Sequence, residues 1–120
     1  MNLKWYYWYF TSAVPPKICD DILEHGNSLE KEMALTGGGN RSKPPSKEEL
    51  KNIQKKRKSD IVWINDAWIY KEIHPYIHQA NASAGWNFQW DFTESCQFTE
   101  YKKGQYYDWH CDSNETPYDK

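Results

Sequence analysis

The sequence predicts an α+β fold in which helices come first and antiparallel strands follow. Apolar residues recur at helical spacing in three segments before residue 85, and short runs of strand-favouring residues with turn signals follow from residue 86. Helices and strands that are segregated along a chain are typical of α+β proteins. With 120 residues, the chain can form one domain with a modest core.

Composition narrows the class of protein further. Aromatic residues make up 17% of the chain while mean hydropathy is −1.01, so the apolar material is concentrated in large rings. A net charge of −2 favours neither nucleic acid nor membrane as a general partner. The 3 cysteines include no C-x-x-C pair, which favours a reducing, cytoplasmic setting over a disulfide framework. No run approaches the roughly 20 apolar residues that span a bilayer.

The N-terminal part of the chain predicts a strand, a helix and a second short strand. Residues 3–10 are dense in strand-favouring rings, and rings in a strand are more often core than a stacking platform for bases or sugars. The Pro-Pro pair at 15–16 then begins a helix, which Gly26 ends or interrupts. Residues 31–36 form the second strand, and residues 36–46 form a loop rich in Gly, Pro and Ser.

The middle of the chain predicts two helices around a buried strand. Ser46 and Glu49 have the spacing of a capping box, which begins a polar, basic helix. The basic run at 55–58 is more simply a solvated helix end than a phosphate patch. Residues 61–65 form a short apolar strand, and Asp66 caps the next helix. The apolar positions of that helix fall on one stripe: Ile69, Ile73, Ile77, Ala80 and Ala84.

Three strand-like segments, residues 86–92, 95–101 and 105–112, complete the prediction. A turn at 103–104 joins the last two as a hairpin. In that register Gln97 lies opposite His110, and a polar face collects Gln97, Thr99, Tyr101, His110 and Asp112. A slip of one residue would invert every assignment, so a pocket and a solvated edge hairpin remain equal interpretations.

His110 and Asp112 form a His-x-Asp unit. On a strand both side chains face one side and can reach one metal ion, while Cys111 points away. A second histidine from elsewhere would complete a facial triad, which leaves positions on iron(II) for a cosubstrate and dioxygen. The pair alone is weak evidence, because His-x-Asp often arises by chance. His74 and His78 also have zinc-binding spacing, but ordinary surface histidines are the simpler explanation.

The stretch CQFTEYKKGQYYDWHCDS, residues 96–113, resembles the iron-binding hairpin of prolyl 4-hydroxylase-like, iron(II)- and 2-oxoglutarate-dependent dioxygenases. The matching positions are Tyr101, Gly104, Tyr107, His110 and Asp112. Upstream, RKSDIVWI and AGWNFQWDF are similar to the lead-in of the bacterial and viral branch. The resemblance covers residues 55–118 well and the N-terminus loosely.

This resemblance implies helices packed on the first strands of a double-stranded β-helix, or jelly roll. Residues 1–120 would be a single partial oxygenase domain, with an N-terminal helical and strand region at 1–85 and the start of the β-helix core at 86–120. The metal ligands would be His110 and Asp112, with no further catalytic residue. Cofactors would be iron(II) and 2-oxoglutarate, with ascorbate as a candidate reductant.

The resemblance assigns Tyr101 to the distal carboxylate of 2-oxoglutarate and Tyr107 to packing beside the site. In the family a second iron-binding histidine and a basic cosubstrate anchor lie well downstream, so we expect a domain incomplete at its C-terminus.

The expected oxidoreductase activity is hydroxylation coupled to conversion of 2-oxoglutarate to succinate and carbon dioxide. The expected substrate is a prolyl residue in a peptide or protein, with a free amino acid or another small molecule left open. Three alternatives remain: a non-catalytic, aromatic-rich binding module, a domain completed by a partner or by a second copy in a homodimer, and a zinc site.

Overall fold

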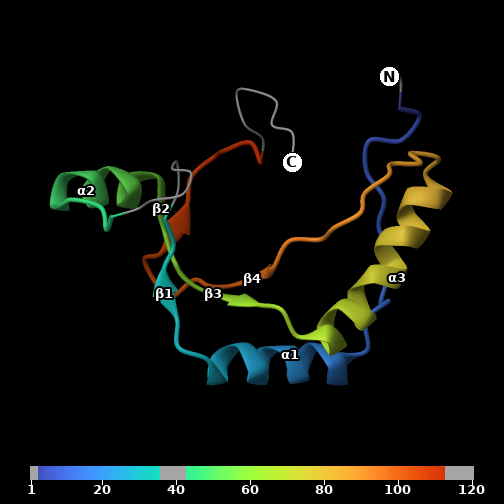
Figure 1. The fold of residues 1–120 in the computed structure, drawn as a ribbon, viewed down its shortest axis with the longest axis horizontal. Helices are drawn as coiled ribbons and strands as arrows, with labels where there is room; N and C mark the ends of the chain where they lie inside the picture. The colour runs from blue at the N-terminus through green and yellow to red at the C-terminus, as the bar shows by residue number, and fades with distance from the viewer. Residues whose placement is uncertain (1–2, 36–42, 113–120) are drawn as a thin grey trace. The chain divides into compact units, whose positions relative to one another are not determined.

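The computed structural model describes residues 3–35 and 43–112 (Figure 1). Their element order is α1 (Pro16–Ser28), β1 (Glu32–Met33), α2 (Lys47–Lys56), β2 (Arg57–Lys58), β3 (Asp60–Ile64), α3 (Ala67–Ser83), β4 (Cys96–Glu100) and β5 (Tyr106–Tyr107). The α+β prediction is confirmed. Most of the predicted loop at 36–46 lies outside the described residues, as does the end of the family resemblance after residue 112. Among the described residues, no helix is long and apolar enough to cross a bilayer.

The chain forms two compact units, each built from two stretches of sequence. Unit 1 comprises the described residues of 1–30 and 62–98, and unit 2 those of 31–61 and 99–120. The strands form one sheet with the order β1-β3-β4 and a second with the order β2-β5. β1 pairs antiparallel with β3, and β2 pairs antiparallel with β5. The predicted division of a single domain after residue 85 stays a prediction.

Helix α1 begins as predicted but does not end at Gly26. Pro15 is the N-cap and Pro16 lies in the first turn, where the missing N–H costs nothing. The helix continues through Gly26 to Ser28. A Cβ atom at Gly26 would lie 2.6 Å from ring carbons of Phe98. The glycine therefore lets an aromatic ring of the same unit pack directly against the helix backbone.

Helix α2 has the predicted capping box at its start, but the basic run at its end differs from the prediction. Ser46 Oγ accepts from the Glu49 backbone N–H at 3.2 Å, and the Glu49 carboxylate accepts from the Ser46 N–H at 3.1 Å. The basic run that follows is not uniformly solvated, because Arg57 is only 7% exposed. Its Nε donates to Ser59 Oγ at 2.9 Å. The buried guanidinium is thus held inside unit 2, while Lys58 beside it is exposed.

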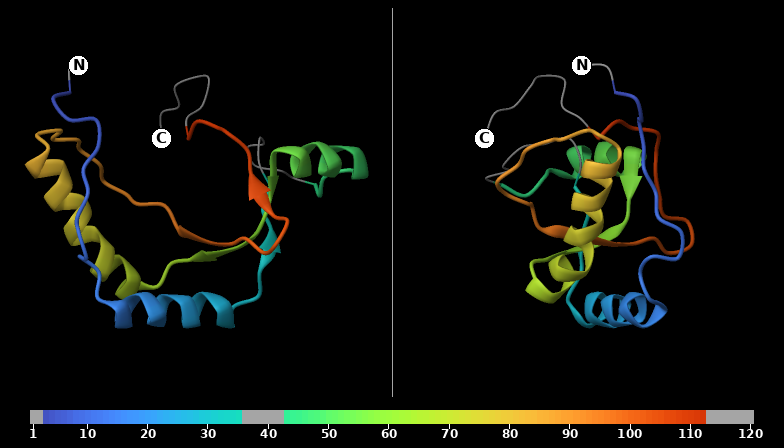
Figure 2. Two further views of the ribbon diagram at one scale, coloured as in Figure 1. Left: turned by 180° about the vertical axis from the view of Figure 1, so that it is seen from behind. Right: turned by 90° about the vertical axis from the view of Figure 1, so that its right-hand side faces the viewer.

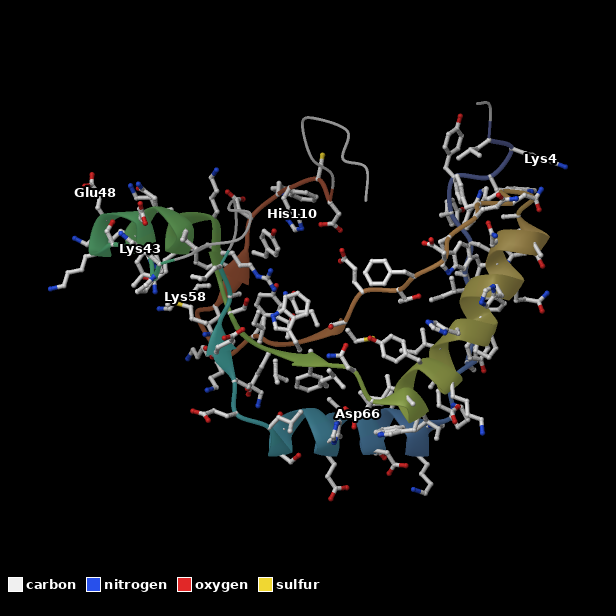
Figure 3. All side chains as sticks on the ribbon, in the orientation of Figure 1. Lys4, Lys43, Glu48, Lys58, Asp66 and His110 are labelled. Carbon is white, nitrogen blue, oxygen red and sulfur yellow. The ribbon has the colours of Figure 1, made fainter. Side chains whose placement is uncertain are left out.

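Helix α3 begins at the predicted place, but Asp66 does not cap it with its side chain. Asp66 occupies the N-cap position without a side-chain cap bond, and its carboxylate lies 3.0 Å from His25 Nε2 instead. Figure 3 labels Asp66 at the start of this helix. Of the predicted apolar stripe, Ile69 and Ala84 are buried, whereas Ile77 is 43% exposed. The helix continues through Pro75.

The aromatic N-terminal segment is neither a strand nor core, contrary to the prediction. It runs along α3 in both views of Figure 2. Trp86 Nε1 donates to the Trp5 carbonyl at 2.6 Å, and the Tyr76 hydroxyl donates to the Ala13 carbonyl at 2.7 Å. The rings are exposed: Trp5, Tyr6, Tyr7, Trp8, Tyr9 and Phe10. Side-chain donors on and after α3 therefore hold this segment by its backbone carbonyls.

The predicted strand at 86–92 is wrong, since these residues form irregular backbone.

The buried apolar residues are small or β-branched. They are Ala34, Ile53 and Ile61 in unit 2, and Ile64, Ile69 and Ala84 in unit 1. Cys19, Cys96 and Cys111 are free thiols.

Candidate metal-binding site

The segment that carries the His-x-Asp unit pairs with a different strand from the one predicted. β5 pairs with β2, placing Tyr107 opposite Arg57. β4 belongs to the other sheet, so the register that put Gln97 opposite His110 is wrong. The turn itself is present: the Gln105 N–H donates to the Lys102 carbonyl at 2.9 Å.

The predicted strand at 105–112 is also shorter in the structure, and β5 covers only Tyr106–Tyr107. The Asp108 N–H donates to the Lys56 carbonyl at 2.7 Å, which extends the contact with β2 by one residue. His110 and Asp112 lie beyond that point, outside any strand. Their shared direction cannot come from strand alternation and must come from local contacts.

Two hydrogen-bonding contacts orient the imidazole of His110, which Figure 3 labels on the chain after β5. Nδ1 lies 2.7 Å from the backbone carbonyl of Asp108, and Nε2 lies 3.2 Å from Oδ1 of Asp112. A carbonyl oxygen only accepts, so Nδ1 carries the proton in this contact. In the neutral ring, Nε2 then presents a lone pair toward a carboxylate oxygen. Two acceptors that face one another in this way are stabilised by a cation between them or by a proton on Nε2.

Ring stacking supports the same imidazole. The Tyr107 ring lies parallel to the His110 ring, with 3.5 Å between centroids and 8° between planes. The guanidinium carbon of Arg57 lies 4.5 Å from the Tyr107 centroid, within the range of a cation–π contact. Arg57 is buried and bonded to Ser59. A chain of contacts thus runs from the interior of unit 2 to the histidine.

The pair is open to solvent. Side-chain exposure is 36% for His110 and 94% for Asp112, so a metal ion from solution can reach both. Tyr101 follows β4 and is 48% exposed. Because the hairpin register is wrong, the argument that Tyr101 shares a face with His110 no longer holds. Its role toward 2-oxoglutarate stays a prediction.

The donor set fits iron(II) as two of its ligands. One imidazole nitrogen and one carboxylate oxygen are donors that a non-haem iron site uses. A backbone carbonyl that bonds the other ring nitrogen and fixes the tautomer is typical of metal-binding histidines. In the part of the chain that the structure describes, no group of three or more His, Cys, Asp or Glu side chains lies close enough to hold a metal. The described residues therefore bring together two candidate ligands.

The second histidine pair is built into ring packing. His78 stacks on Trp90 with 5.1 Å between centroids and 21° between planes, and His74 lies 5.2 Å from the Tyr70 ring. The two imidazoles are 6.2 Å apart and nearly perpendicular. They are therefore packing residues of unit 1 and not a metal-binding pair.

Sequence reasoning missed Arg57 and Asp108. Arg57 stands in a basic run and has no local signal for burial, because the contact that buries it comes from Tyr107, far along the chain. Asp108 acts through its backbone carbonyl, which any residue type provides. The carbonyl lies two residues before His110 and can turn toward its ring because β5 ends at Tyr107. The sequence does not show where that strand ends.

Comparison with protein-family models, curated proteins and solved structures gives no match for this chain. The resemblance to 2-oxoglutarate-dependent dioxygenases therefore rests on the sequence motifs alone, chiefly the one at residues 96–113.

Proposed function

We propose that this chain is an iron(II)- and 2-oxoglutarate-dependent hydroxylase in which His110 and Asp112 are two of the three iron ligands. The observation that supports the proposal best is the orientation of His110. Its Nδ1 is bonded to the Asp108 carbonyl, and its Nε2 lies 3.2 Å from Asp112 Oδ1. With the proton held on Nδ1, the lone pair of Nε2 is free to bind a metal that the neighbouring carboxylate also binds.

Iron(II) held there would supply the binding of 2-oxoglutarate and dioxygen and the oxidising power to hydroxylate a C–H bond. In the proposal, His110 and Asp112 hold the ion, and Tyr107 keeps the imidazole from rotating. Tyr101 donates its hydroxyl to the distal carboxylate of 2-oxoglutarate. In the family that the motif resembles, the third ligand and the basic cosubstrate anchor lie on later strands of the jelly roll than the His-x-Asp unit.

The proposed substrate is a prolyl residue of a peptide or protein in the cytoplasm, with a small molecule as the alternative. The protein's own contribution is to orient the iron ligands and to limit competing oxidation, since the cofactor carries the chemistry. Ascorbate is proposed as an accessory reductant.

The test is succinate formation by the natural full-length product supplied with Fe²⁺, 2-oxoglutarate and oxygen. We expect the wild type to release succinate, and Asp112→Ala to reduce the rate at least about a hundredfold, as expected for a lost ligand. His78→Ala is the matched control, because His78 packs against Trp90 within unit 1, whereas the proposed ligands belong to unit 2. Succinate release that survives Asp112→Ala would remove this residue from the site. Stoichiometric zinc in the purified protein, without succinate, would favour a zinc site.

The exposed aromatic segment supports a second candidate function, a non-catalytic binding module. Tyr6 is 83% exposed and Tyr7 74% exposed, and large exposed rings are typical of recognition surfaces. A hollow of about 360 Å³ is lined by Trp5, Tyr7, Trp8 and Tyr9. A binding module would be indifferent to His110→Ala, whereas the hydroxylase would lose activity.

A further inference from the structure

The irregular segment after α3 is fastened to that helix by side chains of unit 1. The fastening contacts are Asn81 with Phe88, His78 with Trp90, and Tyr70 with Glu94. Asn81 accepts from the Phe88 N–H at 2.9 Å and donates to its carbonyl at 3.0 Å. The Tyr70 hydroxyl donates to the Glu94 carbonyl at 2.9 Å. Desolvation, together with the side-chain hydrogen bond to Cys96, raises the pKa of Tyr70.

The three α3 positions that make these contacts, 70, 78 and 81, share a helix face with His74, for which no fastening contact to residues 86–94 is described. Residues four and three apart lie on one side of a helix. The segment between residues 90 and 94 passes this position, and a cavity of about 650 Å³ lies there. Its walls include Tyr70, Lys71 and His74 from α3. The cavity also has Trp90, Asp91 and Phe92 from the segment, and its size is within the range of small-molecule sites.

Two opposite charges stand on different walls of this cavity. Lys71 belongs to α3 and Asp91 to the following segment, and both are exposed. No ion pair is recorded for either residue within the described ranges 3–35 and 43–112, although both line one cavity. Charges of opposite sign that remain separate on facing elements are complementary to a ligand that carries both signs.

His74 gives a second indication of a ligand. Its Nε2 is buried and has no hydrogen-bond partner among the described residues. Buried polar atoms in native proteins are bonded in the great majority of cases, and an orphaned one requires an explanation. His74 lines the cavity, so a shift of the ring that uncovers Nε2 would let a bound ligand supply the missing partner. The aromatic residues Tyr70, Trp90 and Phe92 provide the apolar surface that the rest of such a ligand needs.

We propose that this cavity binds a free, zwitterionic α-amino acid with an apolar side chain. Lys71 binds the carboxylate, Asp91 binds the ammonium group, and the rings of Trp90 and Phe92 contact the side chain. The proposal is independent of the hydroxylase function, because neither His110 nor Asp112 takes part and all its residues belong to unit 1.

The test is titration calorimetry of the full chain with three probes of nearly equal size. L-Phenylalanine carries both charges, 3-phenylpropionate carries the carboxylate alone, and phenethylamine carries the ammonium group alone. We expect L-phenylalanine to saturate the protein near about 1 mM, and each single-charge probe to bind about fivefold more weakly, the value of one exposed charge pair. Because the probes differ and the protein does not, this comparison does not depend on a variant that folds.

Two charge-removing variants then assign each contact. Lys71→Gln should weaken L-phenylalanine and 3-phenylpropionate about fivefold and leave phenethylamine unchanged, whereas Asp91→Asn should weaken L-phenylalanine and phenethylamine and leave 3-phenylpropionate unchanged. Lys47→Gln and Asp20→Asn, both at exposed positions that do not line the cavity, are the matched controls. Absence of saturation by L-phenylalanine up to about 20 mM would overturn the proposal. Equal binding of all three probes would overturn it as well, since charge would then have no part.

Discussion

The pair His74 and His78 in unit 1 and the pair His110 and Asp112 in unit 2 both have a sequence spacing that can bind a metal, but their surroundings differ. In unit 1, His78 stacks on Trp90 and His74 packs beside Tyr70, and the two imidazole planes are nearly perpendicular. In unit 2, the His110 Nδ1 is bonded to a backbone carbonyl and Nε2 faces a carboxylate. Spacing permits a metal site in both places, but only the second has its donor atoms oriented.

The difference teaches that the contacts of a histidine decide its role more than the sequence interval does. A stacked imidazole whose second nitrogen is bonded keeps one lone pair available in a fixed direction. In an imidazole that fills space between rings, packing sets the orientation of the ring, and the direction of its nitrogens is a consequence of that packing. The same residue type therefore packs between rings in one unit and lies oriented beside a carboxylate in the other.

The largest expected effect is on metal binding. Asp112→Ala should weaken Co²⁺ binding by more than the roughly 10–100-fold that loss of a supporting partner costs, because a ligand itself is removed. His78→Ala should leave Co²⁺ affinity unchanged. The measurement is a Co²⁺ titration of each variant by absorbance or calorimetry. Equal weakening by the two substitutions would mean that the contrast between the pairs is incorrect.

The next effect tests whether close ring packing organises unit 1. Gly26→Ala should lower the free energy of unfolding by about 2 kcal/mol, a usual cost of overpacking, because the added Cβ would lie 2.6 Å from the Phe98 ring. Urea denaturation measures the change. Glu24→Ala, at an exposed position of the same helix, is the control and should change stability little. An unchanged midpoint for Gly26→Ala would show that Phe98 moves aside without cost.

A smaller effect sharpens the role of stacking in unit 2. Tyr107→Leu should weaken Co²⁺ binding about tenfold, because His110 would lose the flat surface that limits its rotation. Tyr107→Phe keeps the ring and should retain the wild-type affinity. Similar losses in both variants would assign the effect to the hydroxyl and not to stacking.

The smallest effect concerns the buried nitrogen of the unit 1 pair. His74→Phe should raise the free energy of unfolding by about 1 kcal/mol, since it replaces an unsatisfied buried polar atom with an apolar ring of similar shape. His74→Gln keeps a polar group and should not stabilise the chain. Thermal or urea unfolding distinguishes the two, and a destabilised His74→Phe would indicate that Nε2 is satisfied in solution.

The sequence alone determined the local features. The capping box at Ser46 and Glu49, the proline start of α1, the start of α3 after Asp66 and the turn around Gly104 all appear where the sequence predicts them. The α+β class follows from the same signals. Each depends on contacts within about four residues, which a linear pattern contains in full. The choice of His110 and Asp112 as candidate ligands came from an equally local pattern, and their metal-binding role stays a prediction.

Only the tertiary structure decided the strand partners and the surroundings of the rings. β5 pairs with β2, and the burial of Arg57 and the stacking of His110 follow from that pairing. The exposure of the N-terminal rings likewise depends on donors at Tyr76 and Trp86, far along the chain. The strand-forming tendency of a segment predicts that it can pair, but it does not predict its partner. The energy of pairing comes from side chains that the fold brings together across the sheet.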